Sequence, residues 1–325
     1  MSNTKYFIGP MSKNVVDSII EFCNKNNHSI GLIPSRRQVE YNGGYVNNWT
    51  IKDFSNYVLR KTNKIILKRD HAGPGQGAFD DDGIVSLISD CKHLEYIHID
   101  PWKKHSDLTA GINSTISLIK MCYAINPKIK FEIGTEQAIR YFSVEELETL
   151  IISLKKHLSH NEYKNIKYLV IQSGTSLKGV TQTGQYNKSR LVEMINLAKK
   201  YNFLSKEHNG DYMHVSTIQE KFSLGLDSIN IAPEFGLIET QTYLNEIKDE
   251  NVLETYFQIC YDSKKWVKWV DESFDPMSNK IELIKICGHY VLSTNDFLTK
   301  IKSTLIGIDK KIKLNITKKL YELYG

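Results

Sequence analysis

No stretch of this sequence is long and apolar enough to cross a membrane. A spanning helix needs roughly 18 or more consecutive apolar residues, and no window of the 325 residues provides them. The first residues, MSNTKYFIGPMSKN, also lack the apolar core of a secretory signal. We therefore expect a cytoplasmic protein that does not enter a membrane.

Paired cysteines are missing as well. The five cysteines are odd in number and isolated, with no Cys-x-x-Cys spacing, and they are Cys23, Cys91, Cys122, Cys260 and Cys287. This pattern argues against a disulfide framework and against a structural zinc ribbon, and it agrees with a reducing compartment.

A concentrated charge of one sign is absent too. The formal net charge is +5, and lysines are mixed with acidic residues throughout, so we expect no nucleic-acid partner. Three basic pairs, Arg36-Arg37, Lys68-Arg69 and Lys103-Lys104, fall at or near the ends of predicted strands. They are either solvated surface charge or part of a pocket for an anionic substrate.

Eight short apolar runs recur along the chain, with amphipathic segments between them. The runs begin at Tyr6, Ser29, Lys64, Tyr96, Ile129, Tyr168, Tyr201 and Ser228. Starts roughly 25 to 40 residues apart leave room for a strand, a helix and a return. The runs are too apolar for half-exposed strands, so we predict an α/β protein with a (β/α)8 TIM barrel. No Gly-x-Gly-x-x-Gly fingerprint follows the first run, which counts against a dinucleotide-binding fold.

The repeat ends near residue 240, and the rest of the chain has helical periodicity. We therefore divide the chain into a barrel over residues 1–240 and a helical C-terminal extension over residues 241–325. The extension is expected to pack on the barrel or to serve as a subunit interface. It could also complete the last barrel helix and form a lid.

Polar residues with chemical potential gather at the ends of the predicted strands. In a TIM barrel these ends converge on one mouth, where active sites lie. The ends carry Gln38, Asp70 and His71, Asp100, Glu136, Gln172 and Gly174, and then His208 and Asp211. Histidines and carboxylates from several strands suit a divalent metal. His98 alternates with Asp100 along its strand and is expected to face the barrel interior as well.

These strand ends resemble those of a known family. The most specific segments are DHAGP, which starts at Asp70, and IGTE, which ends at Glu136. The segment EHNGDY, which starts at Glu207, also matches. Together with weaker matches they cover residues 30 to 240. They resemble the so-called non-catalytic subunit of class II tagatose-bisphosphate aldolase, a family that includes ketohexose and ketohexose-phosphate 4-epimerases. The second strand end departs from the family by carrying Arg36 and Arg37.

The resemblance implies roles for individual residues. His71 would bind the metal, and Asp70 would transfer protons together with Glu136 and Asp100. Catalytic class II aldolases, to which the fold is also similar, take a further histidine ligand where this chain has Gln172. A zinc site would then need His208 and a carboxylate, Glu136 or Asp211. Zinc is the expected metal, with manganese, nickel or magnesium as alternatives.

The resemblance also implies a small sugar or sugar phosphate as substrate. The residues expected to bind it are Arg36, Arg37, Gln38, Gln172, Gly174, Lys178 and Asp211. The leading hypothesis is a metal-dependent epimerase of a ketose or ketose phosphate that works by retro-aldol and aldol steps or by proton exchange. A sugar-phosphate aldolase and a non-catalytic stabilising subunit of an aldolase are the alternatives. The chain could thus associate with an aldolase subunit or with copies of itself.

Overall fold

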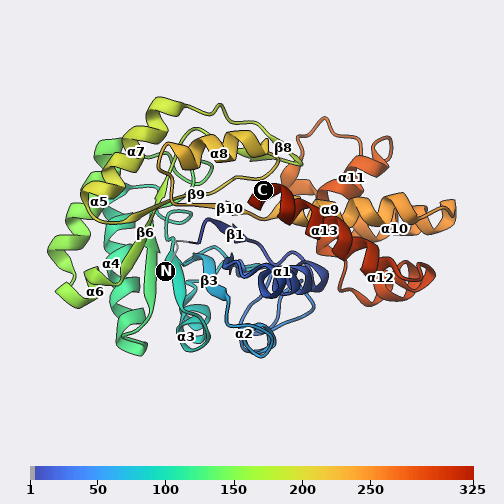
Figure 1. The fold of residues 1–325 in the computed structure, drawn as a ribbon, viewed down its shortest axis with the longest axis horizontal. Helices are drawn as coiled ribbons and strands as arrows, with labels where there is room; N and C mark the ends of the chain where they lie inside the picture. Colours follow the sequence, from blue (N-terminus) through green and yellow to red (C-terminus); the bar gives the residue numbers. More distant parts are fainter. Residues whose placement is uncertain (1–3) are drawn as a thin grey trace.

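Eight parallel strands close into a barrel in the computed structural model, which describes residues 4–325 (Figure 1). In order around the barrel they are β1 (Tyr6–Ile8), β2 (Ile30–Leu32), β3 (Ile65–Ala72), β4 (Tyr96–Ile99), β5 (Lys130–Ile133), β6 (Ile166–Ile171), β9 (Leu204–Glu207) and β10 (Ser228–Ile231). The last strand pairs in parallel with the first and closes the sheet. Each predicted apolar run overlaps one of these strands, so the predicted TIM barrel is confirmed.

Helices alternate with the strands and cover the outside of the barrel (Figure 1). They are α1 (Lys13–Asn26), α2 (Ile51–Leu59), α3 (Ile84–His93), α4 (Leu108–Ile125), α5 (Val144–His157), α6 (His160–Lys164), α7 (Lys188–Lys200), α8 (Val215–Ser223) and α9 (Pro233–Glu246). Their starts follow local chemistry: the Ser143 side chain accepts from the amide of Glu146, and the Glu146 side chain accepts from the amide of Ser143. This reciprocal capping satisfies amides that a first helical turn leaves free.

The barrel interior combines aromatic rings with buried charge. Phe7 and Tyr168 pack edge to face with their ring centroids 5.6 Å apart. Lys206 lies 3.7 Å from the centroid of the Phe7 ring, and Lys68 lies 4.3 Å from that of Tyr168. Both ammonium groups form ion pairs with the buried carboxylate of Glu132. One carboxylate cannot balance two ammonium charges, and burial lowers the pKa of both lysines, that of Lys206 to about 7. The interior therefore holds less positive charge than two ordinary lysines, and this charge lies beside Glu132 and aromatic faces.

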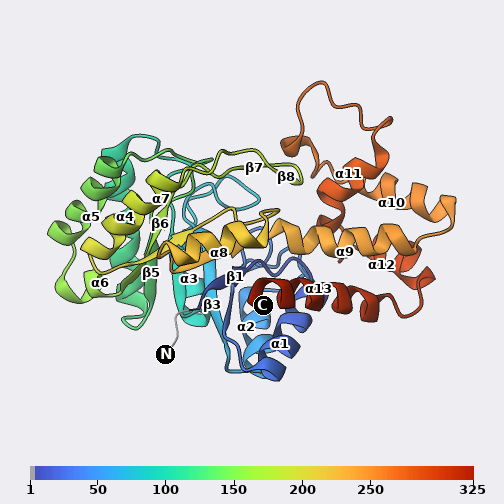
Figure 2. The same cartoon turned by 45° about the horizontal axis from the view of Figure 1, so that its top comes forward.

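The C-terminal part of the chain forms a group of helices to one side of the barrel, and only its last helix runs back toward the barrel (Figure 2). It comprises α10 (Glu250–Asp262), η1 (Val267–Trp269), α11 (Lys280–Cys287), η2 (Gly288–Tyr290), α12 (Asn295–Lys300), η3 (Lys302–Thr304) and α13 (Ile308–Tyr324). Helix α13 returns to pack against α1 and α9, where the Tyr6 hydroxyl donates to the Leu323 carbonyl over 2.6 Å. Among residues 4–325 no helix has the length and apolarity that crossing a membrane requires.

Between β6 and α7 the chain adds a small element that the sequence did not predict. A two-stranded antiparallel hairpin, β7 (Leu177–Lys178) and β8 (Thr181–Gln182), stands apart from the barrel sheet. The Gln182 amide donates to the carbonyls of Asn209 and Asp211, so the hairpin rests on the loop that follows β9.

Candidate functional site

The end of β3 brings Asp70 and His71 to the mouth of the barrel. His71 has a φ of 48°, in the left-handed region that residues other than glycine seldom adopt. Its Nδ1 lies 2.6 Å from Oδ2 of Asp100, at the end of β4. Gly73 permits this close approach of the two strand ends, because a Cβ there would lie 2.7 Å from the Asp100 carbonyl oxygen. Such local strain is often found at functional sites.

Asp100 is a buried anchor for the His71 ring. Its carboxylate also accepts from the Thr135 hydroxyl over 2.9 Å and from the amide of Trp102 over 3.1 Å. Burial opposes protonation of His71, but the charge of Asp70 and the hydrogen bond to Asp100 raise the pKa of His71 to about 10. Asp100 does not line the cavity on whose wall Asp70 and His71 lie, so the structure places it behind the His71 ring.

His98 and His208 are held in the same way as His71. Nε2 of His98 donates to the carbonyl of Gly134 over 2.9 Å, and Nε2 of His208 donates to Glu132 over 2.9 Å. In each ring Nδ1 then lies 3.9 Å from Oδ1 of Asp70. Burial lowers the pKa of both rings well below the usual value for histidine, so both are neutral.

Four side chains therefore converge on one point. Ligand atoms of Asp70, His71, His98 and His208 all lie within 4.8 Å of one another. Three of these groups are imidazoles, and each is fixed through the nitrogen that faces away from Asp70. Metal-binding histidines are normally oriented by such outer hydrogen bonds to a carboxylate or carbonyl. The donor set of imidazoles and one carboxylate fits zinc or a similar divalent ion.

A cavity of about 340 Å³ opens beside this group. Because these four residues are candidate metal ligands, we call it the metal-side cavity. Asp70, His71 and His208 lie on its wall together with Glu136, and Glu136 is not one of the four converging residues. Burial raises the pKa of Glu136. The predicted choice of Glu136 as a metal ligand therefore finds less support in the geometry than its predicted role in proton transfer.

Asp211 lies on the same wall but has a structural attachment. Its Oδ1 accepts from the amides of Ala232 and Glu234, each over 2.8 Å, at the start of α9. Burial, followed by the charge of Glu234, raises the pKa of Asp211 to about 8. Asp211 also lies outside the converging group, so the carboxylate that joins His208 there is Asp70.

The two predicted anion-binding arginines have different environments. Arg36 is 3% exposed and is bound by two carboxylates: Nε donates to Glu40 over 2.7 Å, and the terminal nitrogens donate to both oxygens of Asp81. Arg37 lines the metal-side cavity, and its Nε donates to the Gly77 carbonyl over 3.1 Å. Arg36 also lines a cavity, of about 570 Å³, but its donors are bound to Glu40 and Asp81. Within residues 4–325 only Arg37 of the two has a guanidinium without a carboxylate partner.

The remaining predicted substrate residues are divided between the cavity and the scaffold. Gln38 lines the cavity. Gln172 is buried and uses its amide to join the carbonyls of Thr135 and Arg140 to the amide of Phe142. Gly174, with a φ of 93°, and Lys178 lie in the β6–α7 segment and do not line the cavity; Lys178 is exposed and lies 3.3 Å from Asp271.

The structure places several residues at the site that the sequence did not predict to be functional. His98 was expected to face the barrel interior, and its alternation with Asp100 is the signal that could have identified it as a donor. Lys268, His289 and Tyr290 also line the cavity, although they come from the C-terminal part of the chain. No motif or periodicity connects those three residues with the barrel mouth.

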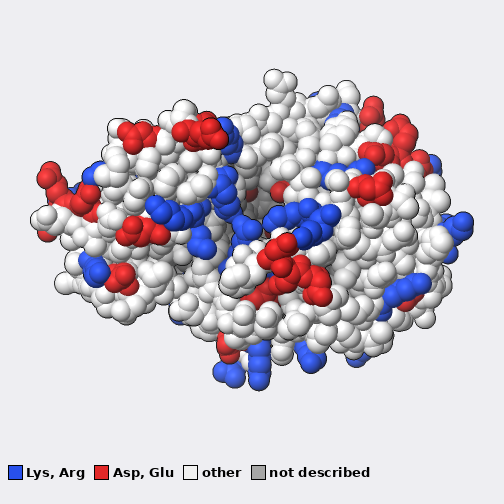
Figure 3. Space-filling view, turned by 180° about the vertical axis from the view of Figure 1, so that it is seen from behind, with Lys and Arg blue, Asp and Glu red and all other residues white. Residues whose placement is uncertain are grey.

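The electrostatic character of the opening is positive. Arg37, Lys103 and Lys268 all line the cavity. Figure 3 shows a hollow in the middle of one face of the molecule, with Lys and Arg side chains on both sides of it and acidic side chains below and within it. Positive charge around a concave site favours an anionic ligand.

Comparison with solved structures supports the fold. The chain superimposes on a protein described as a probable tagatose 6 phosphate kinase from Sinorhizobium meliloti with a TM-score of 0.75 at 13% identity, covering 99% of each chain. It superimposes on the YdjI aldolase from Escherichia coli with a TM-score of 0.53 at 14% identity, covering 95% of this chain and 94% of the other. It superimposes on the fructose-bisphosphate aldolase from Campylobacter jejuni with a TM-score of 0.57 at 12% identity, covering 99% of this chain and 90% of the other.

Sequence comparisons add no family to these structural similarities. No protein-family model matches the chain, and no curated protein matches it in sequence. The chain therefore shares the barrel fold, along nearly its whole length, with solved structures that include two aldolases.

Proposed function

We propose that this protein is a divalent-metal-dependent enzyme that epimerises a ketose or ketose phosphate by retro-aldol and aldol steps. The observation that carries the proposal is the convergence of Asp70, His71, His98 and His208 beside a cavity at the mouth of a TIM barrel. Active sites of this fold lie at that mouth. The resemblance of the strand ends to the non-catalytic aldolase subunit and epimerase family gives the reaction class.

The residues present would hold the metal as follows. His71 through Nε2, His208 through Nδ1 and Asp70 through its carboxylate would be ligands. Nδ1 of His98 faces the same point but accepts from the backbone amide of His71 over 3.3 Å, so His98 also supports the His71 backbone. When bound, a divalent ion supplies Lewis acidity that polarises a substrate carbonyl and a neighbouring hydroxyl. Asp100 and Glu132 position His71 and His208 and do not touch the substrate.

Proton transfer would fall to Glu136. It lines the cavity, and burial raises its pKa above that of an ordinary carboxyl, which strengthens it as a base. Glu136 would take the proton of the substrate hydroxyl while the adjacent carbon–carbon bond breaks. One fragment becomes an aldehyde, and the electron pair of the broken bond passes to the ketone fragment as its enolate. After the aldehyde turns, the bond re-forms on its other face and Glu136 returns the proton.

Metal content and ketose turnover of the purified chain test this proposal. We expect bound metal and C4 epimerisation, and we expect His71→Ala and His208→Ala to lose both while His160→Ala, an exposed helix residue, loses neither. Unchanged metal content in both site variants would remove these histidines as ligands. Metal-free protein that acts only after an aldolase subunit is added would instead support the role of a non-catalytic partner.

An aldolase is the second candidate, because two of the structural neighbours are described as aldolases. The two reactions share the bond-breaking step and differ in whether the fragments leave. A coupled assay for free aldehyde or ketone fragments distinguishes them. Fragment release at the rate of substrate loss would favour the aldolase, and conversion to an epimer without free fragments would favour the epimerase.

A further inference from the structure

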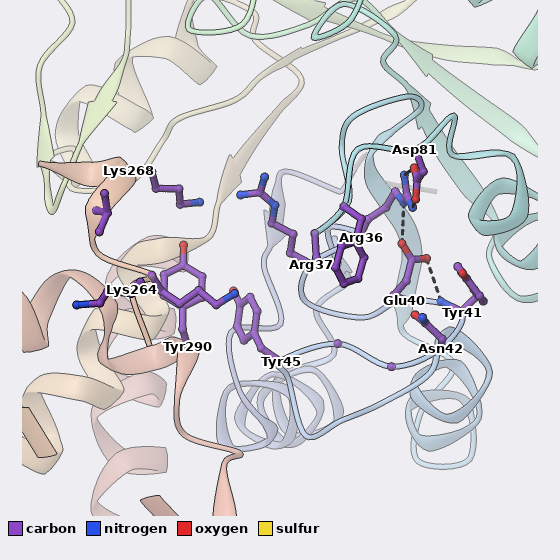
Figure 4. Close-up of a pocket in the computed structure, with 16 residues that line it drawn as sticks. Arg36, Arg37, Glu40, Tyr41, Asn42, Tyr45, Asp81, Lys264, Lys268 and Tyr290 are labelled. Atoms are coloured by element: carbon purple, nitrogen blue, oxygen red, sulfur yellow. Dashed lines mark hydrogen bonds and ion pairs between the residues drawn. The ribbon is translucent and has the colours of Figure 1, made fainter. Parts of the chain in front are cut away.

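A second cavity of about 570 Å³ adjoins the metal-side cavity. Both are lined by Arg37, Tyr45, Lys268 and Tyr290, so the two spaces share a boundary. Figure 4 shows this outer cavity between the loop after β2 and the C-terminal segment, with the ends of Arg37 and Lys268 facing each other. Ligand sites are typically about 300–1,000 Å³, so the outer cavity alone is large enough for a second part of a substrate.

The cations around this boundary lack carboxylate partners. Within residues 4–325, none of Arg37, Lys103, Lys264, Lys265 and Lys268 forms an ion pair, because nearby carboxylates are already bound elsewhere. Glu40 and Asp81 bind Arg36, and Asp80 binds Lys104. The surrounding protein, followed by the positive charges of Arg37, Lys103 and Lys265, lowers the pKa of Lys268 to about 7. Unpaired cations at this density indicate a site for an anion that carries more than one charge.

Aromatic rings line the outer cavity beyond the cations. Tyr45 and Tyr290 pack edge to face with their ring centroids 4.8 Å apart. Phe79 is 80% exposed and Tyr41 is 42% exposed, although both are large aromatic residues. Exposed rings beside a cationic boundary are typical of sites where a planar group stacks next to a phosphate.

His289 provides an independent sign of a ligand. It is 4% exposed, it lines the metal-side cavity, and neither of its ring nitrogens has a hydrogen-bond partner within residues 4–325. Buried polar atoms are nearly always satisfied, so unpaired ring nitrogens on a cavity wall indicate a polar group of a ligand.

We propose that the substrate is a ketose that carries a nucleoside diphosphate on a primary hydroxyl, so that its ketone stays free for the retro-aldol step. Its sugar would lie at the metal-side cavity, its diphosphate at the boundary of Arg37 and Lys268, and its base in the outer cavity among Phe79, Tyr41 and Tyr45. This inference rests on the proposed function, which it extends by naming the substrate class. A sugar bisphosphate is the competing ligand. It would use the cations but would leave the outer cavity and its aromatic residues without a contact.

Binding of simple probes tests the inference without turnover. We expect uridine diphosphate or adenosine diphosphate to bind at least about tenfold more tightly than inorganic pyrophosphate, because a stacked base adds to the affinity of the phosphates. Phe79→Ala should remove most of this advantage and leave pyrophosphate binding unchanged. Lys268→Ala should weaken nucleotide and pyrophosphate alike. Lys300→Ala is the control, since Lys300 is paired with Asp296 away from the cavity. All three side chains are exposed, so folding should be unaffected.

Two results would overturn the inference. Equal affinity for pyrophosphate and both nucleotides would indicate a site for phosphate alone, as in a sugar bisphosphate. Nucleotide binding that is unaffected by Phe79→Ala and Lys268→Ala would place the nucleotide elsewhere. The same titrations on metal-free protein separate this question from catalysis: nucleotide binding without any sugar turnover would refute the proposed function alone, and ketose turnover without nucleotide binding would refute this inference alone.

Discussion

Three imidazole rings in this protein are held in orientation by groups that do not line the metal-side cavity. His71 depends on Asp100, His98 on the Gly134 carbonyl, and His208 on Glu132. Glu132 has an additional task, because the same carboxylate lies within ion-pair distance of two buried lysines, Lys68 and Lys206. One side chain, that of Glu132, therefore both orients His208 and balances buried positive charge.

The substitution Glu132→Gln tests this double role. Breaking a buried ion pair from one side costs about 3–5 kcal/mol, and loss of an outer partner weakens metal binding about 10–100-fold. We expect a lower free energy of unfolding in denaturant and a weaker metal titration. Glu246→Gln, at a surface ion pair with Lys311, is the control. Retained stability and metal affinity in Glu132→Gln would show that the carboxylate charge is dispensable.

The lowered pKa of Lys268 predicts a pH dependence of anion binding. In the free protein, whose Lys268 pKa is about 7, the side chain is increasingly neutral above that pH. A bound anion favours the ammonium form, so binding above about pH 7 requires proton uptake and weakens as pH rises. Calorimetric titration with sulfate, whose charge is constant over this range, should show affinity falling between pH 6 and pH 9. A flat profile would contradict this assignment. Lys268→Met should give a shallower profile, and the remaining slope is expected from Asp211, which lines the same cavity and gains its charge near its pKa of about 8.

At the scale of elements, the loops after β2 and β3 are fastened to each other by Arg36. This guanidinium lies between Glu40 and Asp81 and also donates to the Gly73 carbonyl over 3.3 Å. Its neighbour Arg37 instead faces both cavities. Adjacent residues of the same type therefore have a structural task and a binding task.

The matched variants Arg36→Ala and Arg37→Ala should separate these tasks. Arg36→Ala leaves buried polar partners unsatisfied, so we expect a loss of about 1–3 kcal/mol in the free energy of unfolding. Arg37→Ala should fold normally and bind sulfate more weakly. Thermal unfolding and sulfate titration of both proteins check this. The expectation fails if Arg36→Ala keeps its melting temperature or if Arg37→Ala keeps its sulfate affinity.

The strands were more predictable than the site they carry. Apolar runs identified every barrel strand because a strand buried on both faces must be apolar along its length. The ends of the strands identified Asp70, His71 and His208 for a similar local reason. The distinction between Arg36 and Arg37 could not be predicted, because it depends on Asp81 in a different loop.

At the scale of the whole molecule, α13 joins the end of the chain to its beginning. One face of this helix is buried against α1 and α9, including Ile312, Ile316 and Leu320. The hydrogen bond from Asn14 to Asp309, over 2.8 Å, adds a polar contact between the same two regions. The barrel wall near β1 therefore depends on residues about 300 positions away in the sequence.

Two leucines of α13 provide a matched test of this dependence. Leu320 is fully buried and Leu314 is 57% exposed. Leu320→Ala should lower the free energy of unfolding by about 2–5 kcal/mol because it leaves a cavity. Leu314→Ala should change it by less than about 0.5 kcal/mol. Similar denaturation midpoints for the two variants would mean that α13 contributes little to the stability of the barrel.

The sequence by itself determined the barrel, the order of its strands and the polar residues at their ends, because apolar periodicity and strand-end position are local properties of the chain. The tertiary structure decided which of those residues share a point in space. It placed His98 with Asp70, His71 and His208. It also placed Arg36 between the carboxylates of Glu40 and Asp81. It also brought Lys268 and His289 to the mouth from the far end of the chain. Those outcomes depend on the distance between side chains remote in sequence, which only the folded packing sets.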